Sequence, residues 1–175
     1  MNPINPLTIV FLIFMSLFSF LTEASTLKVG DLAPDFTRIN NKGESITLSK
    51  FKNKKSVVLY FYPKDNTPGC TAQACSFRDA YDVFKKEGAE VIGVSSDDDR
   101  SHDAFAAKYH LPFGLISDSD QSLRKLYGVG STLGVIPGRV TFVIDKKGII
   151  QLIFSAQMKA TQHIEEAIKI IKTGI

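Results

Sequence analysis

The sequence predicts an α/β fold in which a mixed central sheet has helices on both faces. Apolar, β-prone runs alternate with segments of helical periodicity through most of the 175 residues, an order typical of strands joined by helices. Near the end of the chain this order changes, because two apolar runs, 139–145 and 149–155, are separated only by the turn Asp145-Lys-Lys-Gly148. A hairpin of this kind adds antiparallel strands to an otherwise parallel sheet.

The individual elements follow from local patterns. The predicted strands are short runs rich in β-branched and aromatic residues: 27–29 and 45–48, paired as an N-terminal hairpin, then 56–62, 89–95, 113–116 and the two strands of the final hairpin. The predicted helices have apolar residues spaced three and four apart: 70–87, 99–109, 120–127 and 160–173. The last of these carries one apolar face that would pack on the sheet, formed by Ile164, Ala167, Ile168 and Ile171.

The first residues differ from the rest of the chain. Residues 7–21 (LTIVFLIFMSLFSFL) are fifteen residues without a charge, shorter than the ~20 residues of a membrane span and typical of the apolar part of a signal peptide. Thr22 and Ala24 are small residues at the spacing of a cleavage site. We therefore expect a signal peptide at 1–24, cleaved after Ala24, and a single domain at 25–175. This predicts an exported protein, periplasmic or secreted; the alternative is an uncleaved segment that anchors the protein in a membrane.

The charge of the chain excludes one class of partner. The net charge is +3 at pH 7, and the lysines and arginines are spread along the sequence without an aromatic and basic stripe. We therefore expect no binding to nucleic acid. Contact with a membrane is expected only in passing, through the signal segment.

Both cysteines, Cys70 and Cys75, lie where a strand gives way to the helix predicted over 70–87. Pro63 and Pro68 stiffen the preceding loop and withhold hydrogen-bond donors. Cys70 is then at or near a helix start, where unpaired N–H groups and the helix dipole favour a thiolate over a thiol. Because a thiolate is a nucleophile, Cys70 is a candidate catalytic residue.

Two neighbours of Cys70 indicate what this nucleophile attacks. Thr67, three residues earlier, has a hydroxyl that can donate and accept hydrogen bonds and so orient a hydroperoxide. Cys75, five residues later, can capture a sulfenic acid on Cys70 as a disulfide. The C-x4-C spacing alone leaves two alternatives, a structural disulfide and a zinc site. Zinc would need two more ligands, and no two histidines of the chain pair at ligand spacing: His102, His110 and His163.

Three further polar features have both a structural and a functional interpretation. Asp97-Asp-Asp99 falls at the start of the helix 99–109, where acids cap a helix and suit its dipole, so we favour a cap over a metal site. His102 lies in the same first turn and is expected to be solvated or capping. Arg139 follows Pro137-Gly138 and opens an apolar strand, where a charge needs a partner. That partner is an active-site thiolate or, alternatively, a carboxylate.

The stretch 61–79, FYPKDNTPGCTAQACSFRD, resembles the active site of peroxiredoxin Q, the bacterioferritin comigratory protein family of thiol peroxidases. The likeness extends over residues 27–172 and includes GDLAPDF at 30–36, VSSD at 94–97, Ser101-His102 and RVTFVID at 139–145. It implies a thioredoxin-like fold with the N-terminal extension of peroxiredoxins. One position departs from the family, which usually has Glu where this chain has Gln73; glutamine keeps the hydrogen-bonding reach but loses the charge.

The resemblance implies roles for five residues. Cys70 would be the peroxidatic cysteine, which attacks the peroxide, and Cys75 the resolving cysteine, which forms a disulfide with it. Thr67 and Pro63 would shape the peroxide pocket. Arg139 would place a positive charge beside the thiolate.

The residues and the resemblance together predict a monomeric, antioxidant thiol peroxidase that reduces hydrogen peroxide and organic hydroperoxides. An external dithiol such as thioredoxin would reopen the Cys70–Cys75 disulfide. Nothing in the sequence requires haem, flavin, metal or any other cofactor. Two alternatives are a thiol–disulfide oxidoreductase, which typically carries C-x-x-C, and a non-catalytic exported domain held by a structural disulfide.

Overall fold

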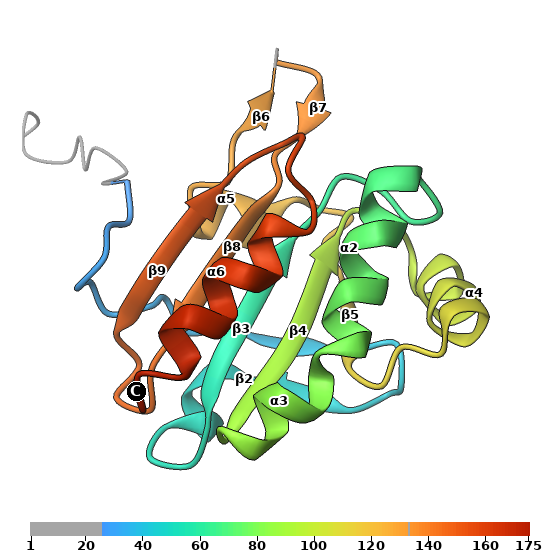
Figure 1. Ribbon diagram of the computed structural model, residues 1–175. Coiled ribbons are helices and arrows are strands. Elements are labelled where there is room, and N and C mark those ends of the chain that lie inside the picture. Colours follow the sequence, from blue (N-terminus) through green and yellow to red (C-terminus); the bar gives the residue numbers. More distant parts are fainter. Residues whose placement is uncertain (1–25, 133) are drawn as a thin grey trace, which may run out of the picture.

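The computed structural model describes residues 26–132 and 134–175, and a five-stranded sheet forms its centre (Figure 1). The strands lie in the order β5 (Gly114–Ser117), β4 (Ala89–Ser95), β3 (Ser56–Phe61), β8 (Val140–Ile144) and β9 (Ile150–Ser155). β3, β4 and β5 are parallel to one another, whereas β8 is antiparallel to both of its neighbours, β3 and β9. The predicted mixed sheet is confirmed.

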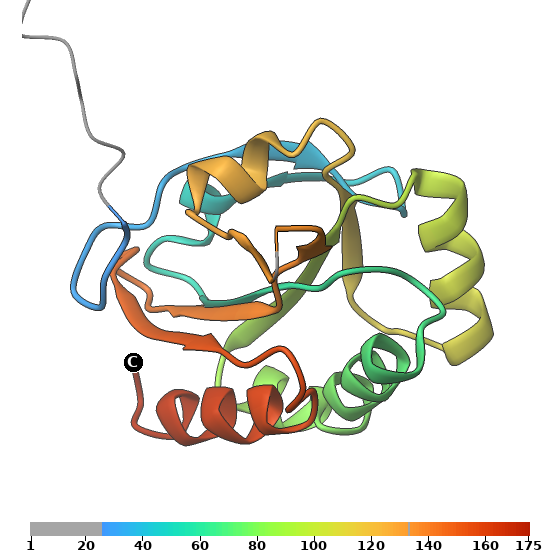
Figure 2. The same ribbon diagram turned by 90° about the horizontal axis from the view of Figure 1, so that it is seen from above.

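Helices cover both faces of the sheet (Figure 2). One face carries α2 (Pro68–Asp79), α3 (Tyr81–Lys86) and α6 (Gln162–Ile171), and α4 (Asp99–Tyr109) lies beside β5. The opposite face carries α5 (Ser122–Leu126), the short 3-10 helix η1 (Leu48–Phe51) and the hairpin of β1 (Thr37–Ile39) and β2 (Ser45–Thr47).

The middle strand, β3, is buried along its whole length because it contacts both layers of helices. Val58 and Tyr60 pack in the core on the α2 side, while Leu59 and Phe61 pack in the core on the α5 side. This alternation follows from the two-residue period of a strand. The carboxyl end of β3 therefore lies at one end of the sheet, and residues 62–67, here called the cysteine loop, connect it to α2.

Two expectations about the elements are wrong. Residues 27–29 do not pair with the strand at 45–48; β1 fills that place, and residues 26–32 instead run beside the start of β9, where Gly30 N donates to Ile150 O at 2.8 Å. The helix predicted over 70–87 is two helices with a break at Ala80. The break directs Tyr81 toward β4, where its hydroxyl donates to Glu90 at 2.7 Å.

Two short strands were not predicted. β6 (Ser131–Thr132) and β7 (Ile136–Pro137) form a small hairpin that projects from the end of the sheet at which β3 ends and α2 begins (Figure 1). The predicted signal segment, 1–24, lies outside the described residues. Among the residues that are described, no helix is long and apolar enough to cross a membrane.

Candidate active site

The two cysteines lie on the same helix, α2. The helix begins at Pro68, whose fixed φ suits the first position, so Cys70 falls in the first turn, as the sequence predicts. The Cys70 side chain is buried, with only 2 % of its surface exposed, whereas Cys75 is partly exposed. Both are free thiols, and Cys70 lies in the helix turn whose backbone N–H groups have no partner within the helix.

Arg139 is the cation next to Cys70. Its Nη2 donates to the Cys70 sulfur at 3.4 Å, and its Nη1 donates to Gln73 Oε1 at 2.5 Å. Gly69 permits this approach, because a Cβ at that position would lie 3.3 Å from Arg139 Nη2. In the part of the chain that the structure describes, no carboxylate forms an ion pair with Arg139. The thiol is therefore the partner of this buried charge, rather than the carboxylate that the sequence left as an alternative.

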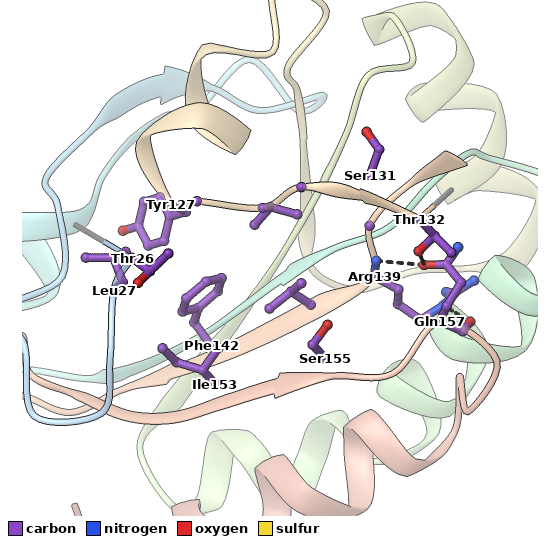
Figure 3. A pocket seen from close by; sticks show the side chains of 15 residues that line it. Thr26, Leu27, Tyr127, Ser131, Thr132, Arg139, Phe142, Ile153, Ser155 and Gln157 are labelled. Carbon is purple, nitrogen blue, oxygen red and sulfur yellow. Dashed lines mark hydrogen bonds between the residues drawn. The ribbon is translucent and has the colours of Figure 1, made fainter. Parts of the chain in front are cut away.

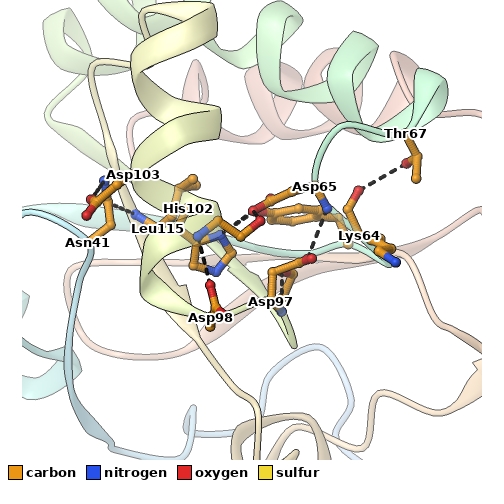
Figure 4. Close-up of polar contacts among 12 residues, drawn as sticks. Asn41, Lys64, Asp65, Thr67, Asp97, Asp98, His102, Asp103 and Leu115 are labelled. Atoms are coloured by element: carbon orange, nitrogen blue, oxygen red, sulfur yellow. Dashed lines mark hydrogen bonds and ion pairs between the residues drawn. The ribbon is translucent and has the colours of Figure 1, made fainter.

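Pro63 and Thr67 belong to the loop between β3 and α2. Thr67 is the last residue before the helix, and its hydroxyl donates to the Lys64 carbonyl at 3.0 Å (Figure 4). This hydrogen bond closes the loop on itself and leaves the lone pairs of the Thr67 hydroxyl oxygen available to a ligand. Pro63, in the same loop, is partly buried.

The same loop is fastened to α4 through a buried pair of Asp65 and His102 (Figure 4). His102 Nδ1 lies 2.8 Å from Asp65 Oδ2, and the Tyr62 hydroxyl donates to Asp65 Oδ1 at 2.7 Å. Burial alone would raise the pKa of Asp65, but hydrogen bonds from His102, Tyr62 and Ser101 together lower it. The expectation that His102 is solvated or capping is wrong: its side chain is fully buried, because Asp65 supplies a partner from the loop.

The acidic run at 97–99 acts as predicted at the start of α4. Asp98 is the N-cap residue and accepts from Ser101 N at 2.8 Å. Asp97 contacts the cysteine loop instead: its carboxylate accepts hydrogen bonds from Asp65 N at 3.0 Å and from the Ser95 hydroxyl at 2.6 Å. The cysteine loop is thus held by backbone and side-chain hydrogen bonds alike.

Arg124, on α5, was not singled out from the sequence. Its guanidinium is buried, donates to the carbonyls of Tyr62 and Gly138, and lies 5.7 Å from the centre of the Phe61 ring. Burial lowers the pKa of Arg124, and this effect is opposed by Asp118, whose negative charge raises it. Arg124 joins the end of β3 to the residue before Arg139, so it fixes the two segments that meet at Cys70.

A cavity of about 290 Å³ lies beside Arg139, between β8, β9 and the segment that follows α5 (Figure 3). Its lining is both apolar and polar: Tyr127, Phe142 and Ile153 form part of the wall, and Thr132 and Gln157 lie beside Arg139. Arg139 therefore borders this cavity, and its guanidinium also contacts the Cys70 sulfur.

Comparison with known proteins gives consistent matches. The AhpC/TSA family matches residues 29–153. The chain is 53 % identical over 145 residues to "Peroxiredoxin Q, chloroplastic" of Populus jackii, and the match covers 82 % of this chain and 68 % of the relative. It is 50 % identical over 159 residues to the protein of the same name from Sedum lineare, and that match covers 90 % of this chain and 82 % of the relative. A solved structure of the bacterioferritin comigratory protein of Xanthomonas campestris is 31 % identical, with a TM-score of 0.74 over 84 % of this chain and 96 % of that one. The predicted thioredoxin-like fold is confirmed by such structures.

The relatives overturn the predicted localisation. Export to the periplasm or the cell exterior was expected from residues 7–21, with a membrane anchor as the alternative. The relatives of Populus jackii, Triticum aestivum and Sedum lineare are all named chloroplastic, which indicates organelle targeting. The prediction failed because an apolar run shows that a segment can enter an apolar environment and does not identify which membrane it meets.

Proposed function

Because the chain belongs to the peroxiredoxin Q group of the AhpC/TSA family, we propose that Cys70 is the residue with which this thiol-dependent peroxidase attacks its substrate. The observation that carries the assignment is the pairing of a buried thiol in the first turn of α2 with a guanidinium that has no carboxylate partner among the described residues. A helix start and a cation both favour the thiolate, which is the reactive form.

The reaction proceeds in three steps. The Cys70 thiolate attacks the terminal oxygen of the hydroperoxide; the sulfur–oxygen bond forms as the oxygen–oxygen bond breaks, and water or an alcohol leaves with a proton. The resulting sulfenic acid condenses with the Cys75 thiol, which forms a disulfide and releases water. An external dithiol such as thioredoxin then supplies two electrons and two protons and restores both thiols.

The substrates are hydrogen peroxide and organic hydroperoxides. The bacterioferritin comigratory protein of Xanthomonas campestris is described by its alkyl peroxide reduction activity, which supports the organic class. Thr67 and Pro63 shape the pocket for the peroxide, and Arg139 holds its oxygen atoms as well as the thiolate. The protein acts as a monomer. A structural disulfide and a thiol–disulfide oxidoreductase are the less favoured functions, given the family.

One experiment separates these functions. Purified protein is supplied with peroxide and a thioredoxin system, and peroxide loss is compared with the reduction of insulin disulfides by the same sample. A peroxidase removes peroxide over many turnovers and reduces insulin no faster than thioredoxin alone. Insulin reduction without peroxide loss would indicate an oxidoreductase, and neither activity would indicate a structural disulfide.

Replacing Arg139 with methionine should shift the absorbance titration of the Cys70 thiolate toward higher pH, because an opposite charge in contact with the sulfur is lost. Less of the reactive thiolate is then present at neutral pH, so the reaction with peroxide should slow by about tenfold or more. The titration is measured in a Cys75→Ser background, which leaves one titrating cysteine. An unchanged midpoint with an unchanged rate would mean that Arg139 is structural.

The division of the chain into a leading segment, 1–24, and one peroxidase domain, 25–175, is also proposed. It predicts that the native protein, recovered from its source and examined by mass spectrometry, begins at Ser25. Recovery of full-length protein that still begins at Met1 would contradict cleavage.

A further inference from the structure

Arg139 is held by two glutamines from different parts of the chain. Gln73 on α2 accepts from Arg139 Nη1, and Gln157, just after β9, accepts twice: its carbonyl oxygen from Arg139 Nε at 3.0 Å and its side-chain Oε1 from Arg139 N at 3.0 Å (Figure 3). Both backbone and side chain of Arg139 are therefore fixed by Gln157. The sulfur of Cys70 receives the remaining contact.

Gln157 is itself fastened on both sides. The Thr132 hydroxyl of β6 lies 3.4 Å from Gln157 Oε1, and the carbonyl of the preceding residue, Ala156, accepts from His163 Nε2 at 3.0 Å. His163 is buried on α6, where its Nδ1 accepts from the Thr141 hydroxyl at 2.8 Å. These contacts connect the turn after β9 to β6, β8 and α6, and they fix the position of Gln157 beside Arg139.

The neutrality of these partners has an electrostatic consequence. At position 73, where the side chain accepts from Arg139 Nη1, a carboxylate would form an ion pair with the guanidinium. At position 157, where the side chain accepts from Arg139 N, a carboxylate would add a negative charge beside the arginine and weaken its effect on the Cys70 thiolate. An amide oxygen fixes the same geometry without supplying a negative charge. Burial lowers the pKa of His163 to about 4, so this neighbour of the turn is neutral at pH 7 and adds no second cation.

The other titratable groups around Cys70 do not replace Arg139. They are Tyr60 on β3, Asp65 in the cysteine loop, Cys75 on α2 and Arg124 on α5. Asp65 is paired with His102, and Arg124 donates to two backbone carbonyls. Arg139 is the group whose guanidinium contacts the sulfur.

We infer that Gln157 is a positioning residue that holds Arg139 against Cys70 and, being neutral, leaves the arginine's charge to the thiolate. The inference rests on the proposed role of Cys70. The turn after β9 would then influence the reactivity of Cys70, although Gln157 lies 87 residues after that cysteine in the sequence.

The first test is Gln157→Leu in the Cys75→Ser background. The substitution keeps the backbone contact and removes the amide that fixes Arg139 N, so the thiolate titration should move to higher pH, by less than the shift measured when Arg139 is replaced. Gln151→Leu is the matched control. Gln151 lies at the start of β9, at the opposite end of the strand from Gln157, and its amide donates to Asp145 at 2.7 Å. It should leave the titration midpoint unchanged.

A double variant shows whether Gln157 acts through Arg139. In Arg139→Met protein, Gln157→Leu should cause no further shift, because the charge that it positions is already absent. Equal shifts with and without Arg139 would overturn the inference, as would an unchanged midpoint in folded Gln157→Leu protein. A merely structural role would lower the melting temperature of Gln157→Leu and leave the midpoint in place.

If Gln157→Leu does not fold, Gln157→Glu takes its place. It keeps an acceptor for Arg139 N but adds a negative charge, so the midpoint should again move to higher pH, and a midpoint equal to that of the parent protein would contradict the inference. Failure of the proposed function is recognised separately. In that case the parent Cys75→Ser protein does not react with one equivalent of hydrogen peroxide at Cys70, whatever residue occupies position 157.

Discussion

Replacing Cys70 with serine should abolish peroxide turnover, lowering the rate by about three orders of magnitude or more, as expected when a nucleophile is removed. A serine hydroxyl at the start of α2 stays protonated at neutral pH and cannot attack the peroxide oxygen, whereas the rest of the site is unchanged. The measurement is loss of hydrogen peroxide with thioredoxin and its reductase over many turnovers. Undiminished multiple turnover in Cys70→Ser protein would refute the assignment of the peroxidatic cysteine.

Cys75→Ser is the informative companion to that variant. It should consume about one equivalent of peroxide and then stop, because the sulfenic acid on Cys70 has no thiol to condense with. Mass spectrometry should find one added oxygen on Cys70, or two and three after excess peroxide. Continued turnover with thioredoxin would mean that the reductant attacks Cys70 directly and that Cys75 is not required.

Local patterns were sufficient for the elements that carry the site. β3 and β4 follow from runs of buried β-branched and aromatic residues, and α2 starts at Pro68, whose fixed φ suits the first position of a helix. The break between α2 and α3 was missed because no glycine or proline marks Ala80. The break directs Tyr81 to Glu90, a residue of another element that the local sequence does not reveal.

The residues that were misjudged depend on partners far along the chain. His102 is buried because Asp65, 37 residues earlier, meets it, and Arg124 is buried because it bonds to the carbonyl of Tyr62, 62 residues earlier. Gln157 looks like any polar residue after a strand until Arg139 is placed beside it. A single sequence contains no pattern for such pairs. Arg139 could be proposed because a cation next to an apolar strand requires a partner in any fold.

Formation of the Cys70–Cys75 disulfide should unfold the first part of α2. On a regular helix, five residues advance about 7.5 Å and turn about 140° on a cylinder of radius about 2.3 Å, which places the two Cα atoms about 8.6 Å apart. A disulfide tolerates about 7 Å at most, and the two side chains point to different faces of the helix. Because both cysteines lie within α2, Pro68–Asp79, the bond cannot close while that helix is intact.

Hydrogen exchange measures this unfolding directly. We expect oxidation to raise amide exchange from Cys70 to Asp79, and the change should end at Ala80, because α3 begins anew at Tyr81 and is held to β4 by its own contact with Glu90. Phe77 and Arg78 should change environment with it, since the buried Phe77 ring and the bond from Arg78 Nη1 to the Tyr109 carbonyl, 2.8 Å, both depend on the helical path.

The comparison is between reduced protein and the disulfide form, by exchange mass spectrometry on peptides that cover 70–88. The buried face of α6, which includes Ile164 and Ile171, serves as the internal control and should keep its protection in both forms. Equal protection of α2 in the two forms would mean that Cys70 and Cys75 do not pair with each other, since a helix that remains closed holds them too far apart to bond. Loss of protection that reaches α6 would instead indicate that the unfolding spreads beyond α2, because α6 packs mainly on β8 and β9 and less extensively on α2.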